Sequence, residues 1–275
     1  MLLKEKIEKI FDANFNVSED EGVSLFNELK FFLNKGEIRA AEFVNGKWHV
    51  NDWIKKGILI GFKFGKVFEF KLNKFPFFDK HILNLKKIEL EDKIRIVPGG
   101  SSIRDGVYIG KNVVIMPPSY VNIGSYIGDN TMIDSNVLVG SCAQIGNRVH
   151  LSAGSQIGGV LEPIGNFPVI IEDDVLVGGN VGIFEGVIIK KSCVIASGVQ
   201  ITSSTVVYDL VKKEVLKKTG NYPLTIPKNA VVVMGSRKIN DDFANEFGIS
   251  IYTPIIIKYR DDKTNRSTQL EKLLR

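Results

Sequence analysis

Residues 119–146 read SYVNIGSYIGDNTMIDSNVLVGSCAQIG, and an aliphatic side chain recurs at every sixth position of this stretch. A helix would repeat its apolar residues about every 3.6 positions, and a half-buried strand would repeat them at every second position. The period of six fits neither element. It extends to both sides of the stretch, and its members are Ile103, Ile109, Ile115, Val121, Ile127, Ile133, Val139, Ile145, Leu151 and Ile157.

The period slips by two positions through residues 161–168, LEPIGNFP, and then resumes. The aliphatic positions of this second run are Ile171, Val177, Ile183, Ile189, Ile195, Ile201 and Val207. Small or polar residues often follow the aliphatic one, and such residues adopt the positive φ of tight bends. Three short strands and three bends close one coil of about eighteen residues, and stacked coils form a parallel β-helix. The pattern therefore predicts a mainly β fold. It excludes a β-sandwich, whose turns recur about every 8–12 residues.

Residues 1–90 are expected to form a small α-rich domain before the coil. Helical spacing of apolar residues predicts helices within residues 2–15, 21–36 and 51–64. The last of these segments also fits a helix–strand unit, with Asn51 or Asp52 as the capping residue. A β-hairpin is expected in residues 37–50, with its turn at Asn45 and Gly46, because Asn-Gly favours the tight hairpin turn.

The β-helix itself is expected to span residues 91–210. The period ends after Val207, and residues 211–275 are expected to form a short C-terminal capping segment. Within it, residues 225–239 are predicted to form a turn and a strand, and residues 267–275 a short helix. Such a cap would cover the strand edges at the open end of the coil.

Composition fits a soluble cytoplasmic protein of 275 residues and 30.6 kDa. The segment after Met1 is polar and rich in Lys and Glu, which argues against a signal peptide, and no apolar run is long enough to span a membrane. Two cysteines, Cys142 and Cys193, form no disulfide or metal framework. The net charge of +5 comes without a dense basic block, so we expect neither nucleic acid nor a membrane as a partner.

Several motifs are more specific than the repeat. They include SYVNIG at residues 119–124, GSCAQIG at 140–146, VHLS at 149–152, IGGVLEP at 157–163, RIVPGGSSIRDGVYI at 95–109 and KWHVNDWIKK at 47–56. These motifs resemble those of the tetrahydrodipicolinate N-succinyltransferases, hexapeptide-repeat acyltransferases of bacterial lysine and diaminopimelate synthesis. The resemblance covers nearly the whole chain. It implies that the β-helix is left-handed.

The resemblance also implies a reaction and an assembly. Members of the family are homotrimers with active sites in clefts between neighbouring β-helices. The donor would be succinyl-CoA, a co-substrate rather than a bound cofactor. The acceptor would be the amine of ring-opened or hydrated tetrahydrodipicolinate, which attacks the thioester carbonyl. Such a site must hold both reactants, accept a proton from the amine and stabilise the oxyanion.

Asp134 and Arg95 are the candidate site residues. Asp134, in TMID, matches the substrate-binding aspartate of the family, which implies a catalytic contact with the acceptor's amine; a turn residue at a coil corner is the alternative. Arg95, in KIRIVPGG, matches the family's substrate arginine, and its guanidinium suits an acceptor with two carboxylates. Arg104 is a nearby competitor that could instead be structural. The sequence points to no residue that contacts CoA.

Other residues have weaker signals. His150 resembles the histidine base of other hexapeptide acyltransferases, but its position in this family is structural. Cys142 and Cys193 are expected to be small corner residues. Gly158 and Gly159 either admit a ligand close to the backbone or simply occupy a coil corner. The inserted segment 161–168 is expected to line the cleft, as expelled loops commonly do.

The chain departs from the family's pattern at two places. Thr-Trp commonly follows the aspartate, but Ser135 and Asn136 stand here. An Arg-x-Glu motif is common where this chain has Asn180 and Gly182, and Glu185 lies half a repeat further on, where it should point elsewhere. A different acceptor, an acetyl donor or an inactive relative therefore stay open as alternatives.

Two other classes of function fit poorly. A zinc-dependent lyase on the same coil would need several histidines, but only His150 lies in the repeat, so no metal site is expected. A non-catalytic binding scaffold would present a regular array of one outward residue type, whereas the outward positions here are mixed.

Overall fold

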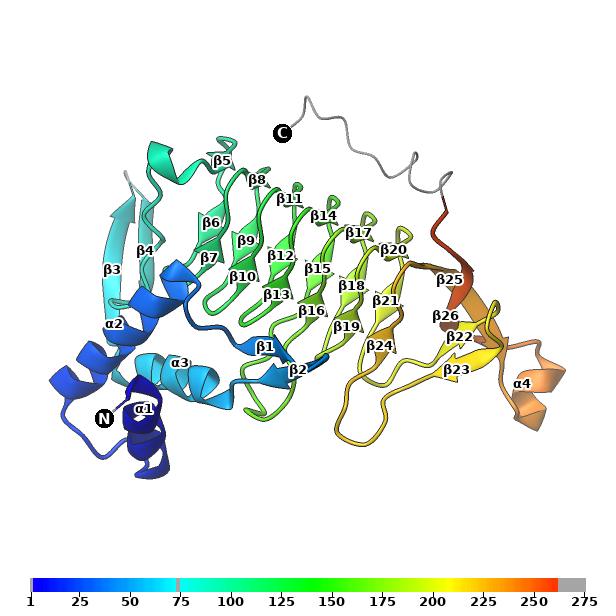
Figure 1. Cartoon of the computed structure of the whole chain (residues 1–275), viewed down its shortest axis with the longest axis horizontal. Coiled ribbons are helices and arrows are strands. Elements are labelled where there is room, and N and C mark those ends of the chain that lie inside the picture. Colours follow the sequence, from blue (N-terminus) through cyan, green and yellow to red (C-terminus); the bar gives the residue numbers. More distant parts are fainter. Residues whose placement is uncertain (1, 73–74, 262–275) are drawn as a thin grey trace.

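The computed structural model describes residues 2–72 and 75–261 and shows a long coil with helices beside one end (Figure 1). The strands of the coil fall into three sets of parallel strands, in which each inner strand pairs with the strands one coil before and one coil after it. The parallel β-helix expected from the period of six is therefore confirmed. We call its three sheets the first, second and third face.

The three faces follow one another in each turn of the coil. The strands of the first face are β5 (Arg95–Ile96), β8 (Val114–Ile115), β11 (Met132–Ile133), β14 (His150–Leu151), β17 (Leu176–Val177) and β20 (Val194–Ile195). Those of the second face are β6 (Ser102–Ile103), β9 (Tyr120–Val121), β12 (Leu138–Val139), β15 (Gln156–Ile157), β18 (Gly182–Ile183) and β21 (Gln200–Ile201). Those of the third face are β7 (Tyr108–Ile109), β10 (Tyr126–Ile127), β13 (Gln144–Ile145), β16 (Ile170–Ile171), β19 (Ile188–Ile189) and β24 (Thr225–Ile226).

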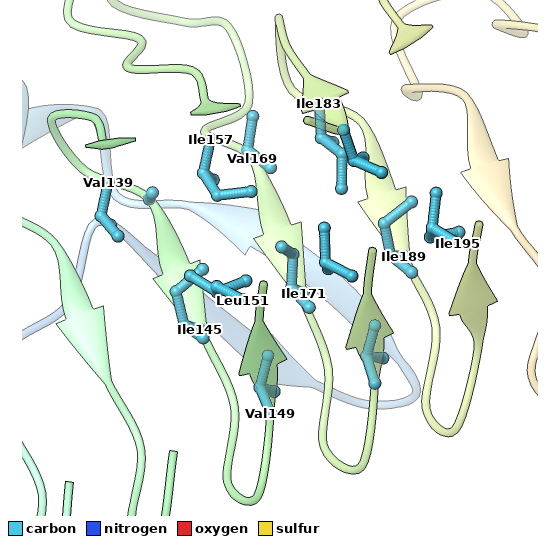
Figure 2. Packing of buried hydrophobic residues seen from close by; sticks show 14 of the residues in the cluster. Val139, Ile145, Val149, Leu151, Ile157, Val169, Ile171, Ile183, Ile189 and Ile195 are labelled. Carbon is cyan, nitrogen blue, oxygen red and sulfur yellow. The ribbon is translucent and has the colours of Figure 1, made fainter. Parts of the chain in front are cut away.

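The aliphatic residue of each strand points into the coil and stacks on its counterpart in the next coil. Val139 pairs with Ile157, which pairs with Ile183, and all three side chains are fully buried. Valines two positions earlier, such as Val149, add a second layer inside (Figure 2). Burial of each such side chain contributes about 1.5–3 kcal/mol, so the repeat supplies a continuous core along the axis.

The N-terminal helices form where the sequence predicts them. They are α1 (Leu3–Asp12), α2 (Glu19–Lys35) and α3 (Asp52–Phe64). The side chain of Ser18 accepts a hydrogen bond from the backbone N–H of Glu21 at the start of α2, and Gly36 ends that helix with a φ of 69°. Asn51 precedes α3 but makes no side-chain capping bond; its amide donates instead to the carbonyl of Arg39 at 2.8 Å.

Two hairpins complete this part. In the expected one, β1 (Ala41–Val44) and β2 (Lys47–Val50) pair antiparallel, and Asn45 and Gly46 both have positive φ, as the tight turn requires. The second hairpin, β3 (Val67–Leu72) with β4 (Phe75–Lys80), was not expected. A short 3-10 helix, η1 (Leu90–Asp92), then leads into the coil.

The end of the coil differs from expectation. Val207 lies six positions after Ile201, but its strand β22 (Val207–Asp209) pairs with β23 (Glu214–Leu216) and β26 (Ser250–Tyr259) rather than with a strand of the coil. The period resumes at Ile226 and Val232, which stack on strands β19 and β20. The prediction that the period ends at Val207 was therefore wrong, because a long insertion hides its last two members.

The expected turn and strand in residues 225–239 are confirmed as β24 and β25 (Ala230–Lys238). The strand β25 pairs with β26 after the short helix α4 (Asp242–Glu246), and this hairpin extends the first face beyond the coil. The helix predicted in residues 267–275 lies outside the described residues. The domain boundaries at residues 90 and 210 stay predictions.

Candidate functional site

The coil has three edges, and they differ in regularity. The ladder edge joins the third face to the first and contains Asp129, Asn147 and Asp173. The Asp134 edge joins the first face to the second. The loop edge joins the second face to the third, and both insertions of the coil leave from it, after Ile157 and after Ile201.

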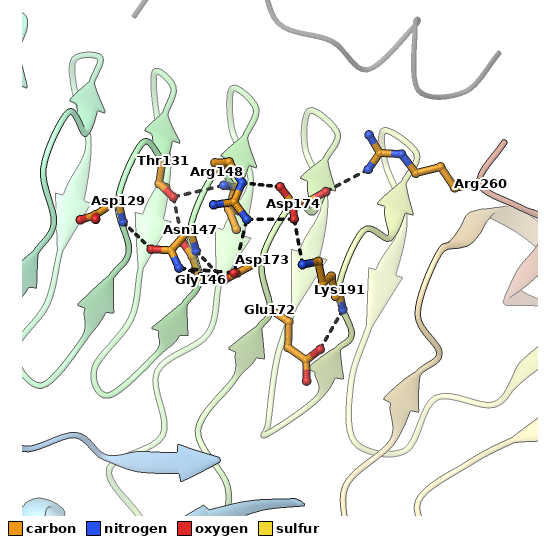
Figure 3. A network of polar contacts seen from close by, with 11 residues as sticks. Asp129, Thr131, Gly146, Asn147, Arg148, Glu172, Asp173, Asp174, Lys191 and Arg260 are labelled. Atoms are coloured by element: carbon orange, nitrogen blue, oxygen red, sulfur yellow. Dashed lines mark hydrogen bonds and ion pairs between the residues drawn. The ribbon is translucent and has the colours of Figure 1, made fainter. Parts of the chain in front are cut away.

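The ladder edge is held by side chains that bond to the backbone of the preceding coil. The carboxylate of Asp129 accepts from the N–H of Lys111, Asn147 accepts from the N–H of Asp129, and Asp173 accepts from the N–H of Asn147, each at 2.8 Å (Figure 3). Each corner of the ladder edge also contains one residue with positive φ; these residues are Asn112, Asn130, Arg148, Asp174, Ser192 and Asn229. The polar groups of this edge are therefore engaged in holding the coils together.

An ion pair strengthens the same edge. Arg148 donates from Nε to Asp174 at 2.6 Å, and the backbone carbonyl of Asp174 accepts from Arg260 at 3.0 Å (Figure 3). The hydrogen bond from Arg148 holds the pKa of Asp174 below its usual value. These charges thus have structural partners within the chain.

Asp134 follows the inward Ile133 and lies at the outer end of the first face. Its backbone N–H donates to the carbonyl of Leu151 at 2.9 Å, and its Oδ1 accepts from the N–H of Ser135 at 2.7 Å. No other residue in the described ranges bonds its Oδ2. The side chain is half-buried. The corner therefore fixes one of the two carboxylate oxygens.

Arg95 lies on the same outer face. Its strand β5 pairs with β8, which pairs with β11, and Arg95 is in register with Val114 and Met132. Side chains alternate between faces along a strand, so Arg95 and Asp134 both point out of the coil. Neighbouring strands lie about 4.8 Å apart and residues rise about 3.3 Å along a strand, so Arg95 and Asp134, two strands and two positions apart, lie about 12 Å from each other.

The outward direction of Arg95 depends on one extra residue. Ile96 pairs with Ile115, nineteen positions later, whereas the other pairs of the first run, such as Ile115 with Ile133, are eighteen apart. The additional residue is accommodated at Gly99 and Gly100, whose φ angles are 144° and 90°. A shift of one residue exchanges the two faces of a strand.

Arg104, the competitor of Arg95, has a structural role. Its guanidinium bonds the hydroxyl of Tyr120 at 3.0 Å and the carbonyl of Leu83 at 2.6 Å, and it pairs with the carboxylate of Asp79. It therefore attaches the β3–β4 hairpin to the start of the coil. These contacts leave Arg95 as the candidate for substrate binding.

The loop edge holds a cavity of about 540 Å³ between the two insertions. Ile157 and Ile171 are fourteen positions apart, and Ile201 and Ile226 are twenty-five, compared with six in a regular repeat. The cavity is lined by Gly159, Val160, Glu162, Pro163, Gly165, Asn166 and Phe167 from the first insertion, Glu185, and Ser203, Lys218, Asn221 and Pro223 from the second. The prediction placed only the first insertion at a cleft.

Glu185 projects to the loop edge, whereas Gly182 lies on the second face. The carboxylate of Glu185 accepts bonds from the N–H and hydroxyl of Ser203, at 3.3 and 2.7 Å. A Cβ at Gly182 would approach Gln200 to 2.1 Å and Phe184 to 2.4 Å, so neighbours occupy the space of a side chain there. As expected, Glu185 points in a different direction from position 182.

The two glycines of IGGVLEP are required by close packing within the chain. A Cβ at Gly159 would lie 2.6 Å from the backbone nitrogen of Ser141, and one at Gly158 would lie 2.9 Å from the ring of Phe184. Packing against the preceding coil and Phe184 therefore explains both residues. Gly159 also lines the cavity of the loop edge.

The remaining candidates have structural surroundings. Burial raises the pKa of the thiols of Cys142 and Cys193 to about 12, which disfavours a reactive thiolate. Cys142 is a corner residue with a φ of 66°, and the thiol of Cys193 bonds the carbonyl of Pro227. His150 lies on the outside of the first face, in register with Met132.

Residues 2–72 and 75–261 contain neither a cluster of metal-ligating side chains nor a membrane-spanning helix. In that part of the chain, side chains of the metal-ligating types do not gather in threes at any place. In the same part, every helix is too short or too polar to cross a membrane.

Family models match most of the N-terminal domain and the coil. The model described as Tetrahydrodipicolinate N-succinyltransferase N-terminal matches residues 2–64. Bacterial transferase hexapeptide (six repeats) matches residues 124–159, and Hexapeptide repeat of succinyl-transferase matches residues 168–203. The expected left-handed β-helix of hexapeptide repeats is the fold of these families.

Curated relatives match the chain over nearly its whole length. The 2,3,4,5-tetrahydropyridine-2,6-dicarboxylate N-succinyltransferase of Buchnera aphidicola subsp. Baizongia pistaciae is 41% identical over 281 residues, covering 99% of this chain and 97% of that protein. The protein of the same name from Sodalis glossinidius is 37% identical over 285 residues, covering 99% and 98%. That from Acinetobacter baylyi is 41% identical over 248 residues, covering 88% and 86%. This chain therefore belongs to the tetrahydrodipicolinate N-succinyltransferases, a family of hexapeptide-repeat acyltransferases.

Proposed function

We propose that this chain transfers the succinyl group of succinyl-CoA to the amino group of tetrahydrodipicolinate in its ring-opened or hydrated form. The observation that carries the proposal is the match to curated N-succinyltransferases along 99% of the chain. The reaction belongs to lysine and diaminopimelate synthesis. We place it in the cytoplasm, because two free cysteines suit a reducing compartment.

Arg95 and Asp134 bind the acceptor in this proposal. Their support is geometric, since both side chains leave the outer surface of the first face about 12 Å apart. A guanidinium pairs bidentately with one acceptor carboxylate. The free oxygen of Asp134 then faces the amine, which is the group that must lose a proton.

The chemical step needs no covalent enzyme intermediate. The neutral amine attacks the thioester carbonyl, a carbon–nitrogen bond forms, and the carbon–sulfur bond breaks to release the CoA thiolate. Asp134 accepts the proton that the amine loses, which is the role of a general base. Holding the two reactants in contact supplies a large part of the rate acceleration.

In this proposal the donor lies at the loop edge of one subunit, where that edge meets the acceptor residues on the first face of a neighbouring subunit. The cavity there has a volume of about 540 Å³, and Lys218 offers it a positive charge. The carboxylate of Glu185 is already held by Ser203, so it competes less for that lysine. The acyl donor carries phosphates and a succinyl carboxylate, to which a lysine is complementary.

A homotrimer completes the proposed site. Several outward residues of the first face are apolar and partly exposed, namely Met132, Leu176 and Val194. Such a surface suits contact with a neighbouring coil. Light scattering at micromolar concentration should give three times the chain mass of 30.6 kDa. A fully active monomer would overturn the trimer.

The reaction is tested by thiol release in the presence of tetrahydrodipicolinate and either succinyl-CoA or acetyl-CoA. Rapid release with succinyl-CoA, dependent on the acceptor, is the expected result. A preference for acetyl-CoA would overturn the assignment of succinyl-CoA as the donor. This outcome is tested because Asn180 and Gly182 stand where the family commonly has an Arg-x-Glu motif. Absence of transfer from both donors would overturn the reaction.

A further inference from the structure

Lys55 is a buried lysine on α3 that the proposed reaction does not use. Its side chain is 0% exposed, although Lys is among the residues least often fully buried. Its Nζ donates a hydrogen bond to the backbone carbonyl of Asn166, in the first insertion of the loop edge. An N-terminal helix is thereby joined to a loop more than a hundred positions away.

Apart from Asp52, whose charge acts on the ammonium, the surroundings of Lys55 are apolar. The helix α3 packs Ile54 and Ile58 against Ile123 and Cys142, which are corner residues of the loop edge. Leu161, from the first insertion, packs against the same cluster. Burying an ammonium in such a place costs free energy unless a partner compensates. The carbonyl of Asn166 is a compensating partner, so the position of the loop and the charge of Lys55 depend on each other.

The loop that Lys55 holds is one wall of the cavity. Asn166 and Phe167 both line it. Phe167 also contacts Tyr222 of the second insertion, with ring centroids 5.6 Å apart. A displacement of residues 160–167 would therefore alter both walls of the cavity together.

We propose that Lys55 is a positioning residue for the donor side of the site, fixing residues 160–167 through Asn166 so that the cavity of the loop edge keeps its shape. The inference rests on the proposed function in placing the acyl donor at that cavity. Lys55 touches neither substrate in this arrangement. It acts through the loop.

The test compares Lys55→Met with the matched control Lys56→Met in the full chain. Lys56 is the next residue of α3, but its ammonium pairs with Asp12 of α1 at 3.2 Å. Hydrogen exchange of residues 160–167 is measured by mass spectrometry, together with KM for succinyl-CoA, KM for the acceptor and the melting temperature. Lys55→Arg, which retains a donor, serves as the conservative variant.

In Lys55→Met we expect loop exchange to rise about 10- to 100-fold, the factor that corresponds to a lost charged hydrogen bond. KM for succinyl-CoA should rise, with little change in KM for the acceptor or in melting temperature. Lys56→Met should match the wild type, and Lys55→Arg should recover part of the loss. If Lys55→Met does not fold, Lys55→Gln takes its place.

Equal loop exchange in Lys55→Met and the wild type would overturn the proposal. A parallel loss of stability and of affinity for both substrates would reduce Lys55 to a general structural residue. If the wild type transfers no acyl group, the proposed function fails and the donor assignment fails with it. The exchange measurement would then still decide whether Lys55 holds the loop.

Discussion

The ladder edge and the loop edge belong to the same coil but use their polar groups differently. At the ladder edge, Asp129, Asn147 and Asp173 each bond the backbone of the preceding coil at 2.8 Å, and no insertion interrupts the corners. At the loop edge, two insertions leave the coil and enclose a cavity of about 540 Å³. The regular corners use their polar groups to hold the coils together. In the proposed function, the irregular corners present theirs to a ligand.

The Asp134 edge lies between these extremes. Apart from the first, which holds the extra residue at Gly99 and Gly100, its corners are as short as those of the ladder edge. Among the described residues, however, the carboxylate of Asp134 bonds only its own corner, through Ser135. In contrast, the carboxylate of Asp173 crosses to another coil. Two aspartates of the same β-helix therefore have different expected roles, and substitution of each tests the difference.

The largest expected effect follows from Asp134→Asn. Asparagine keeps the shape and the turn preference of the corner but loses the charge and the ability to accept the amine's proton. Turnover should fall about 10²-fold or more, the scale of a lost general base, with a nearly unchanged melting temperature. Steady-state kinetics and thermal unfolding are measured on the same sample. If the variant retains most of its succinyl transfer, Asp134 is a corner residue like those of the ladder.

A smaller effect is expected from Arg95→Ala. The acceptor would lose a charged hydrogen-bonding partner, which is worth about 1.5–3 kcal/mol, or roughly 10- to 100-fold in acceptor binding. Affinity for CoA should stay unchanged, because Arg95 lies on the first face and the donor cavity lies at the loop edge. Acceptor and CoA affinities are measured separately by calorimetry. Wild-type acceptor affinity in Arg95→Ala would remove Arg95 from the site.

The ladder edge is tested by Asp173→Ala. Removal of the carboxylate leaves the part-buried N–H of Asn147 without its partner, and the loss of such a hydrogen bond costs about 0.5–1.5 kcal/mol. Denaturant unfolding should show this loss, while the catalytic constants of the folded enzyme stay close to the wild type. Glu162→Ala, in the exposed first insertion, is the matched control and should change stability by no more than about 0.5 kcal/mol. Equal stabilities of the two variants would contradict the contrast between the edges.

The coil could be predicted from the sequence because its interior has room for one aliphatic residue per strand. That constraint produces the period of six in the sequence. Its last members were missed for a physical reason: Val207 falls six positions after Ile201 by coincidence, whereas the next true members, Ile226 and Val232, follow a long insertion. The phase was recovered after the first insertion because six regular members follow it, from Ile171 to Ile201, whereas only Ile226 and Val232 follow the second.

The candidate site was predictable to different degrees. Asp134 follows an inward residue of the unbroken run, so its place on the outside of the coil follows from the period. The outward position of Arg95 does not follow from the period, because one extra residue at Gly99 and Gly100 exchanges the two faces of its strand. The cavity and Lys55 were missed, since both depend on contacts between segments far apart in the chain. A useful signal was present in the two long intervals between aliphatic positions, after Ile157 and after Ile201, because both insertions leave the β-helix at the same edge.

The hairpin of β3 and β4 was missed because its sequence mixes two patterns. Phe68 and Phe70 alternate with Glu69 and Lys71, as in a strand, but they directly follow the apolar face of α3. The prediction of a helix or a helix–strand unit covered residues 51–64 only, and no element was assigned to the residues of this hairpin. Gly65, between the two patterns, was the available signal for a boundary.

The smallest expected effect concerns pH and the junction between α3 and the loop edge. Burial lowers the pKa of Lys55 below its usual value, and the groups that face its ammonium are Cys142 and Asp52. Because the unfolded chain binds this proton more tightly than the folded one, Lys55 makes stability rise with pH between its folded pKa and about 10.5. Lys55→Met lacks this contribution, whereas Cys142 and Asp52 are present in both chains.

The measurement is the difference in unfolding free energy between the wild type and Lys55→Met, taken from denaturant titrations between neutral pH and about pH 10.5. The wild type should gain stability relative to the variant as pH rises, because the cost of burying a charged ammonium disappears when it loses its proton. No such gain is expected above the unfolded pKa, where both states are neutral. Stability curves that run parallel over the whole range would mean that the ammonium of Lys55 is fully compensated by its partners. The junction would then resemble the ladder edge, where charged groups are matched by partners within the chain.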